Sequence, residues 1–188
     1  MKTNIFIYLF LLIAYLFFAQ DAKAENIHFN NDIYILKTSI YSSENKGFEN
    51  EYYLGGNNNP NWGKKIGIYY YSEIKDPIKF ALAEDKKIES NTETILLKFI
   101  ANKKQNKALL SYINSGEEND LPYFEHNIYK YEPHPTKGIM VLKYTKRYFP
   151  KTNEDATNIA QEIKATNDDL MEQLIISPIP PIVEKEIE

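Results

Sequence analysis

The chain has 188 residues, a formal net charge of −4 and no cysteine. A modestly acidic chain with scattered lysines argues against a nucleic-acid partner, which would require a basic patch. Without cysteine, thiol catalysis, thiolate metal sites and disulfides are excluded. A packed hydrophobic core must therefore stabilise the fold, and the 15 tyrosines and 10 phenylalanines can contribute to it.

The first 24 residues have the features of a secretory signal peptide. Lys2 supplies the positive charge, residues 5–19 are an apolar stretch, and Ala22 and Ala24 offer a small-residue cleavage site before Glu25. The apolar stretch is shorter than the ~20 residues needed to span a bilayer. We therefore expect cleavage of residues 1–24, a periplasmic or secreted protein, and no membrane anchor after cleavage.

Several stretches of the remaining chain are typical of β-strands, because β-branched and aromatic residues recur in them. The polar segment 102–107 and the Pro/Gly-containing segment 133–138 are typical of hairpin turns. The expected strands are 32–43, 48–54, 65–74, 92–101, 108–115, 122–132 and 138–149. In this reading, the segment before residue 32, which contains His28, has no regular structure.

Two segments are typical of helices. Asp76 is a good N-cap and Pro77 a good first helical residue, so we expect a helix from there to about Glu89. A long helix follows Thr152 or Asn153 and ends before Pro178. The expected buried residues are Ile78, Ala81, Leu82 and Ile88 in the first helix, and Ile159, Ile163, Leu170 and Leu174 in the second.

This order predicts an α+β fold with a largely antiparallel sheet of about six or seven strands. Residues 94–101 are apolar on both faces of their strand, so we expect the two helices to sandwich the sheet. One domain should cover residues 25–177. The Pro-rich, acidic tail 178–188 should be extended, and held in place only if Ile179, Ile182 and Val183 find a surface.

The element order resembles the PsbP-like fold of the photosystem extrinsic P proteins, the Mog-type Ran-binding proteins and their bacterial exported relatives. The points of contact are the Asn-rich loop before Trp62, the apolar strand after it, the Asp76–Pro77 helix start, and the sequence Lys146-Arg147-Tyr148 at the end of the last strand. The resemblance implies an αβα sandwich and a mostly non-catalytic binding or accessory role. It implies no catalytic residues, and no metal or photosystem contacts can be carried over.

Motifs for catalysis are missing from the sequence: there is no G-x-S-x-G, H-E-x-x-H or Walker-type glycine loop. The cluster of Glu125, His126, Glu132 and His134 is the one set of acid/base groups to weigh. On a strand, Glu125 and His126 point to opposite faces, and Glu132 lies roughly 20 Å along the strand from His126. We therefore expect no enzyme, no metal site and no cofactor, with a hydrolase using Glu125, His126 or Glu132 as the alternative.

Aromatic residues follow the Asn-rich loop. Trp62 is the only tryptophan, and Tyr69 and Tyr71 share one strand face while Tyr70 shares the other with Ile66 and Ile68. The rings either fill the interfaces between sheet and helices, or form a binding cleft with Trp62 at its mouth. The candidate binding residues are Asn59, Asn61, Trp62, Tyr69 and Tyr71. The favoured function is protein–protein binding, and a small-ligand carrier with an aromatic cavity is a further alternative.

Overall fold

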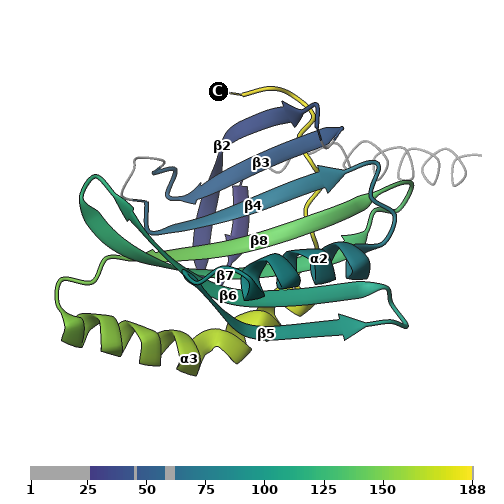
Figure 1. Ribbon diagram of the computed structural model, residues 1–188. Coiled ribbons are helices and arrows are strands. Elements are labelled where there is room, and N and C mark those ends of the chain that lie inside the picture. Colours follow the sequence, from purple (N-terminus) through teal and green to yellow (C-terminus); the bar gives the residue numbers. More distant parts are fainter. Residues whose placement is uncertain (1–25, 45, 58–61, 188) are drawn as a thin grey trace, which may run out of the picture.

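The computed structural model describes residues 26–44, 46–57 and 62–187. The expected signal peptide lies outside these residues. The described part of the chain contains eight strands and two helices (Figure 1). These are β1 (Asn26–Phe29), β2 (Asp32–Ser42), β3 (Gly47–Leu54), β4 (Lys64–Tyr71), α2 (Pro77–Glu89), β5 (Thr94–Asn102), β6 (Lys107–Glu118), β7 (Leu121–Pro133), β8 (Ile139–Tyr148) and α3 (Asn153–Ile176).

The strands form one antiparallel sheet in the order β1-β2-β3-β4-β8-β7-β6-β5. The α+β class and the antiparallel sheet are thus confirmed, but the sheet is larger than expected. The expectation that His28 lies in an irregular segment was wrong, because His28 pairs with Ile33 in the β1–β2 hairpin. Asn30 and Asn31, with φ of 50° and 63°, form the turn of that hairpin. Asparagine tolerates this left-handed conformation better than most residues.

Both helices begin where the sequence predicts. The Asp76 carboxylate accepts hydrogen bonds from the backbone N–H groups of Ile78 and Lys79, and Thr152 caps α3 through the N–H of Asp155. These bonds satisfy N–H groups that have no partner inside a helix. Leu82, expected in the core, is instead 38% exposed on α2.

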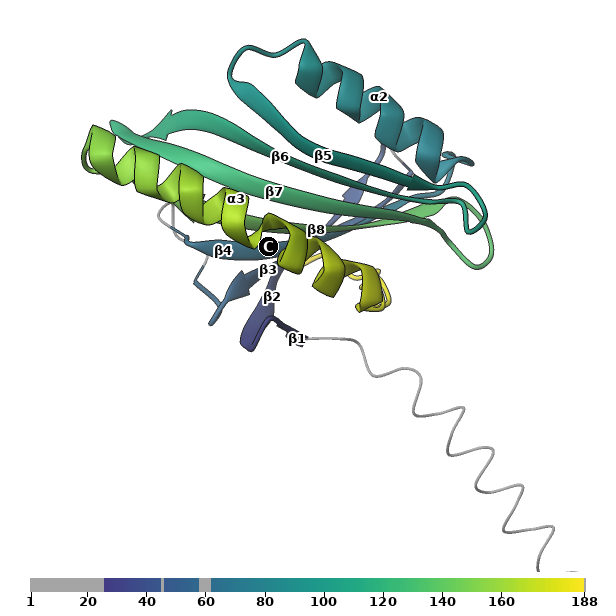
Figure 2. The same ribbon diagram turned by 90° about the horizontal axis from the view of Figure 1, so that it is seen from below.

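The two helices lie on opposite faces of the sheet (Figure 2). Helix α2 packs over β5, β6 and β7, and α3 packs over β6 and β7 from the other side. Side chains alternate between two cores accordingly. The core under α2 includes Leu110, Tyr131, Ile139 and Val141, and the core under α3 includes Ile66, Ile128, Leu142, Tyr144 and Leu174.

The C-terminal tail also belongs to the folded unit. Val183 is buried at 3% exposure, and Ile179 and Ile182 pack against the core on the α3 side. The Asn50 side-chain amide binds the Val183 backbone twice, accepting from its N–H at 2.6 Å and donating to its carbonyl at 3.0 Å. The tail therefore covers the half of this sheet face that α3 leaves uncovered.

Candidate functional site

The two faces of the sheet differ in how much of them is covered. On the α3 side, α3 covers one half and the tail with β1 covers the other. On the α2 side, α2 covers β5 to β7, and neither of the two described helices covers β2, β3 and β4, although the Trp62 ring packs on Tyr53 near one end of β4. This uncovered surface is the candidate site, and we call it the open face.

The open face carries apolar, aromatic and acidic side chains. Pairing of Ile40 with Glu49, and of Glu49 with Tyr69, places these three residues in one row across β2, β3 and β4. Ile33 and Ile40 are 49% and 54% exposed, more than most apolar residues of the sheet. The open face consists of Ile33, at the end of β2 that pairs with β1, together with Ile40, Glu49, Glu51, Tyr69 and Tyr71.

A cavity of about 220 Å³ lies where the open face meets α2. Its walls are mostly aromatic, and the Glu84 carboxylate is its one acidic group. Burial raises the pKa of Tyr71, and the Glu49 and Glu84 carboxylates raise it further. The phenol groups therefore stay protonated and can donate hydrogen bonds to a ligand. The lining residues are Tyr69, Tyr71, Phe80, Glu84, Tyr129, Tyr131 and Val141.

Gly67 determines where the Tyr69 ring lies. A Cβ atom at Gly67 would be 2.4 Å from the Tyr69 hydroxyl, so the ring occupies the space that a side chain at 67 would fill. Gly67 pairs with Glu51 on β3 and with Lys143 on β8. Burial raises the pKa of the Tyr69 hydroxyl, and the nearby Tyr129 phenol and Glu51 carboxylate act in the same direction.

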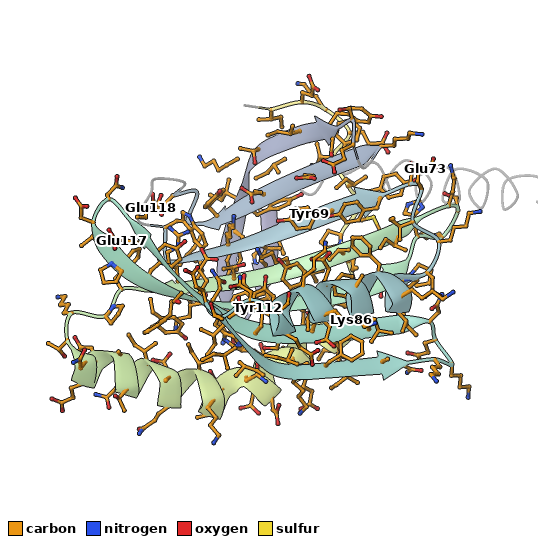
Figure 3. The ribbon with its side chains drawn as sticks, viewed as in Figure 1. Tyr69, Glu73, Lys86, Tyr112, Glu117 and Glu118 are labelled. Carbon is orange, nitrogen blue, oxygen red and sulfur yellow. The ribbon has the colours of Figure 1, made fainter. Side chains whose placement is uncertain are left out.

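Beyond Gly67, a lysine and two tyrosines come together on neighbouring strands. Lys143 pairs with Tyr129, and its ammonium lies 5.1 Å from the centre of the Tyr129 ring. The Tyr129 and Tyr112 rings stack 5.8 Å apart, with their hydroxyls at 3.3 Å. Figure 3 shows Tyr69 and Tyr112 on the face of the sheet that also carries α2. We call Tyr69, Tyr112, Tyr129 and Lys143 the phenol–lysine cluster.

Of the residues expected to bind, Tyr69 and Tyr71 lie on the open face. Trp62 is only 7% exposed, and Arg147 and Lys65 stack on its ring, with the Arg147 guanidinium carbon at 4.2 Å from the ring centre. This placement favours the packing interpretation of Trp62. Asn59 and Asn61 lie outside the described residues.

The candidate acid/base residues do not lie together in the structure. Glu125 lies on the α2 side and binds Arg147 at 2.6 Å, whereas His126 is buried on the α3 side. Glu132 lies near the opposite end of β7, where it pairs with Lys107 at 2.9 Å. His134 is a half-buried turn residue whose ring contacts Tyr70.

Helix α3 contributes a buried polar cluster that the sequence did not indicate. Ser111 and His126 both bind the Asn167 side-chain oxygen, the His126 Nε2 atom at 3.0 Å. Burial lowers the pKa of His126, so the ring is neutral at pH 7. The cluster therefore links α3 to β6 and β7 of the sheet through buried hydrogen bonds.

Sequence reasoning also missed Lys143 and Tyr112. The signal was present in the alternation of the strands 108–115 and 138–149, which places Tyr112 and Lys143 on the same side as Tyr129 once the pairing is known. Among residues 26–44, 46–57 and 62–187, no group of His, Asp and Glu side chains is arranged to hold a metal ion. No helix of the same residues has the length and hydropathy needed to cross a membrane.

A protein-family model matches residues 22–179, which covers most of the chain. No curated protein and no solved structure matches it.

Proposed function

The chain belongs to the protein family whose model matches residues 22–179, and we propose that it is an exported, non-catalytic protein that binds a protein partner on its open face. The observation that carries the proposal is the unequal cover of the sheet. The α3 side is closed by a helix and by the tail, whereas Ile33 and Ile40 stay about half exposed on the α2 side. Covering such an isoleucine contributes on the order of 1 kcal/mol to association.

The composition of the open face suits a protein partner. Exposed isoleucines and tyrosines lie beside carboxylates that are held in ion pairs, such as Glu51 with Lys65 at 2.7 Å. An apolar centre bordered by polar groups is typical of protein interfaces, and tyrosine is enriched in their strongest contacts. The PsbP-like assignment belongs to the same proposal, and the helices on opposite faces of an antiparallel sheet support it.

The alternatives fit the geometry less well. A hydrolase needs acid and base groups in one cleft, and the opposite orientation of Glu125 and His126 supports a non-catalytic role. A small-ligand carrier needs a cavity of roughly 300–1,000 Å³. The cavity of about 220 Å³ beside α2 is smaller, and its size suits one or two side chains of a partner.

The test is capture of a partner by the tagged protein from the exported fraction of its own cells. The double variant Ile33→Glu/Ile40→Glu places charges on the open face, and we expect it to lose the partner while its melting temperature stays nearly unchanged. Leu82→Glu is the matched control, because Leu82 is a partly exposed residue of α2 away from the open face. Equal capture by the double variant and the control would contradict the proposal.

A further inference from the structure

We propose that the phenol–lysine cluster binds a carboxylate, supplied by an aspartate or glutamate side chain of an extended segment of the partner. The inference rests on the proposed function and specifies the chemistry of the partner. It assigns Lys143 as the cation that receives the carboxylate, and the hydroxyls of Tyr69, Tyr112 and Tyr129 as the surrounding donors.

The charges around the cluster single out Lys143. The neighbouring carboxylates of Glu51 and Glu125 already bind Lys65 and Arg147, at 2.7 Å and 2.6 Å. In the described part of the chain, no carboxylate oxygen lies within 4.0 Å of the Lys143 ammonium, which lies 5.1 Å from the Tyr129 ring centre and whose charge helps to lower the pKa of Glu51. A half-buried ammonium in contact with an aromatic ring gains most from an incoming anion, because the surroundings screen it less than bulk water does.

The hydroxyls supply the rest of the site. The Tyr112 and Tyr129 hydroxyls are 3.3 Å apart, so one donates to the other and one proton remains for a ligand. Burial raises the pKa of Tyr112, and the nearby Lys143 charge acts against that shift, which places the ammonium within electrostatic range of this phenol. The Tyr69 hydroxyl lies over Gly67, the residue paired with Lys143.

The acidic surroundings select the kind of anion. Glu51 and Glu125 flank the cluster, so an anion of charge −2, such as a phosphate ester, meets stronger repulsion than a carboxylate of charge −1. Residues next to the carboxylate in the partner segment can then lie on Ile33 and Ile40 or enter the tyrosine-lined cavity. The geometry therefore points to an acidic side chain flanked by apolar ones.

The experiment is an acetate titration of the full mature chain, followed by the side-chain ¹⁵N–¹H signals of its lysines. We expect a saturable shift of the Lys143 signal, weakened several-fold by Tyr112→Phe. Lys146 is the matched control, because Glu162 already binds its ammonium at 2.8 Å. We also expect inorganic phosphate to bind more weakly than acetate at pH 8.

Two outcomes of the titration overturn the inference. Equal, non-saturating shifts of Lys143 and Lys146 mean that acetate only screens charge, and saturation by phosphate without saturation by acetate means a site for dianions. Neither outcome touches the proposed function, which depends on capture through Ile33 and Ile40. In the capture assay, Lys143→Met should lower the affinity for the partner about tenfold or more, which is the effect of losing one charge-assisted hydrogen bond. Unchanged capture by Lys143→Met would contradict this inference and leave the proposed function intact.

Discussion

The guanidinium of Arg147 lies between two aromatic rings, with its central carbon 4.2 Å from the ring centres of both Trp62 and Tyr123. Its nitrogens bind the Glu125 and Glu118 carboxylates, and its backbone N–H donates to the Gly63 carbonyl at 2.8 Å. Trp62 therefore closes one end of the sheet. The ring holds the chain that enters β4 against the end of β8.

Replacing Trp62 tests this packing role. Trp62→Ala removes a ring that is 7% exposed and leaves one face of the Arg147 guanidinium without its aromatic partner. Because truncation of a buried aromatic leaves a cavity, we expect the free energy of unfolding to fall by about 3–5 kcal/mol, measured by urea denaturation. Tyr41→Ala, at a ring that is 46% exposed, is the control and should lower the free energy of unfolding far less.

The same residue gives a spectroscopic check on the wild-type protein. A buried indole should emit at short wavelength and resist quenching by acrylamide. A red-shifted and readily quenched emission would contradict the packing role, and would make Trp62 a candidate contact residue again.

The attachment of the tail to Asn50 gives a second prediction. Val183→Asp places an unpaired charge in a site that is 3% exposed, so we expect a loss of about 3 kcal/mol or more in unfolding free energy. Ile176→Asp is the matched control, because Ile176 is 77% exposed at the end of α3 and should change stability by about 0.5 kcal/mol at most. Thermal melts that do not distinguish the two variants would mean that the tail is not part of the core.

The buried His126 gives a third prediction, on pH. Burial lowers the pKa of His126 in the folded protein below its ordinary value of 6.5, and the nearby Lys146 charge acts in the same direction. As the pH falls below 6.5, the unfolded chain binds this proton before the folded chain does, so stability decreases. Above pH 6.5 the imidazole is neutral in both states, and stability is unaffected by it.

The window for this effect lies between pH 6.5 and about 4.5, below which carboxylates such as Glu51 and Glu162 begin to lose their ion pairs. We expect a fall of up to ~1.4 kcal/mol per pH unit within it. His126→Gln should flatten this slope, whereas His134→Gln, in an exposed turn, should keep it. An unchanged slope in His126→Gln would assign the pH dependence to another group.

Much of the fold could be predicted because local signals agreed with the final structure. Asp76 with Pro77 and Thr152 with Asp155 mark helix starts through bonds that form within a few residues. Alternation on β4 correctly separated Tyr69 and Tyr71 from Tyr70. These features depend only on neighbours in the sequence.

Other features depend on contacts between distant residues. The strand β1 is only four residues long, and its core partner Tyr144 lies on β8, 5.3 Å from Phe29 between ring centres. The buried polar cluster joins Ser111 on β6 to Asn167 on α3. Nothing in the local pattern shows such partners, and the phenol–lysine cluster was missed for the same reason, since it depends on the order of strands β4-β8-β7-β6.

The central claim is that a partner covers the open face, and in-cell photo-crosslinking tests it most directly. A photoreactive phenylalanine analogue at position 40 replaces an isoleucine that is 54% exposed on the open face, and one at position 82 replaces a leucine that is 38% exposed on α2. We predict a single, abundant crosslinked protein from position 40, lost in the presence of Ile33→Glu, and little or none from position 82. Equal yields from both positions, or no crosslink from position 40, would contradict the account.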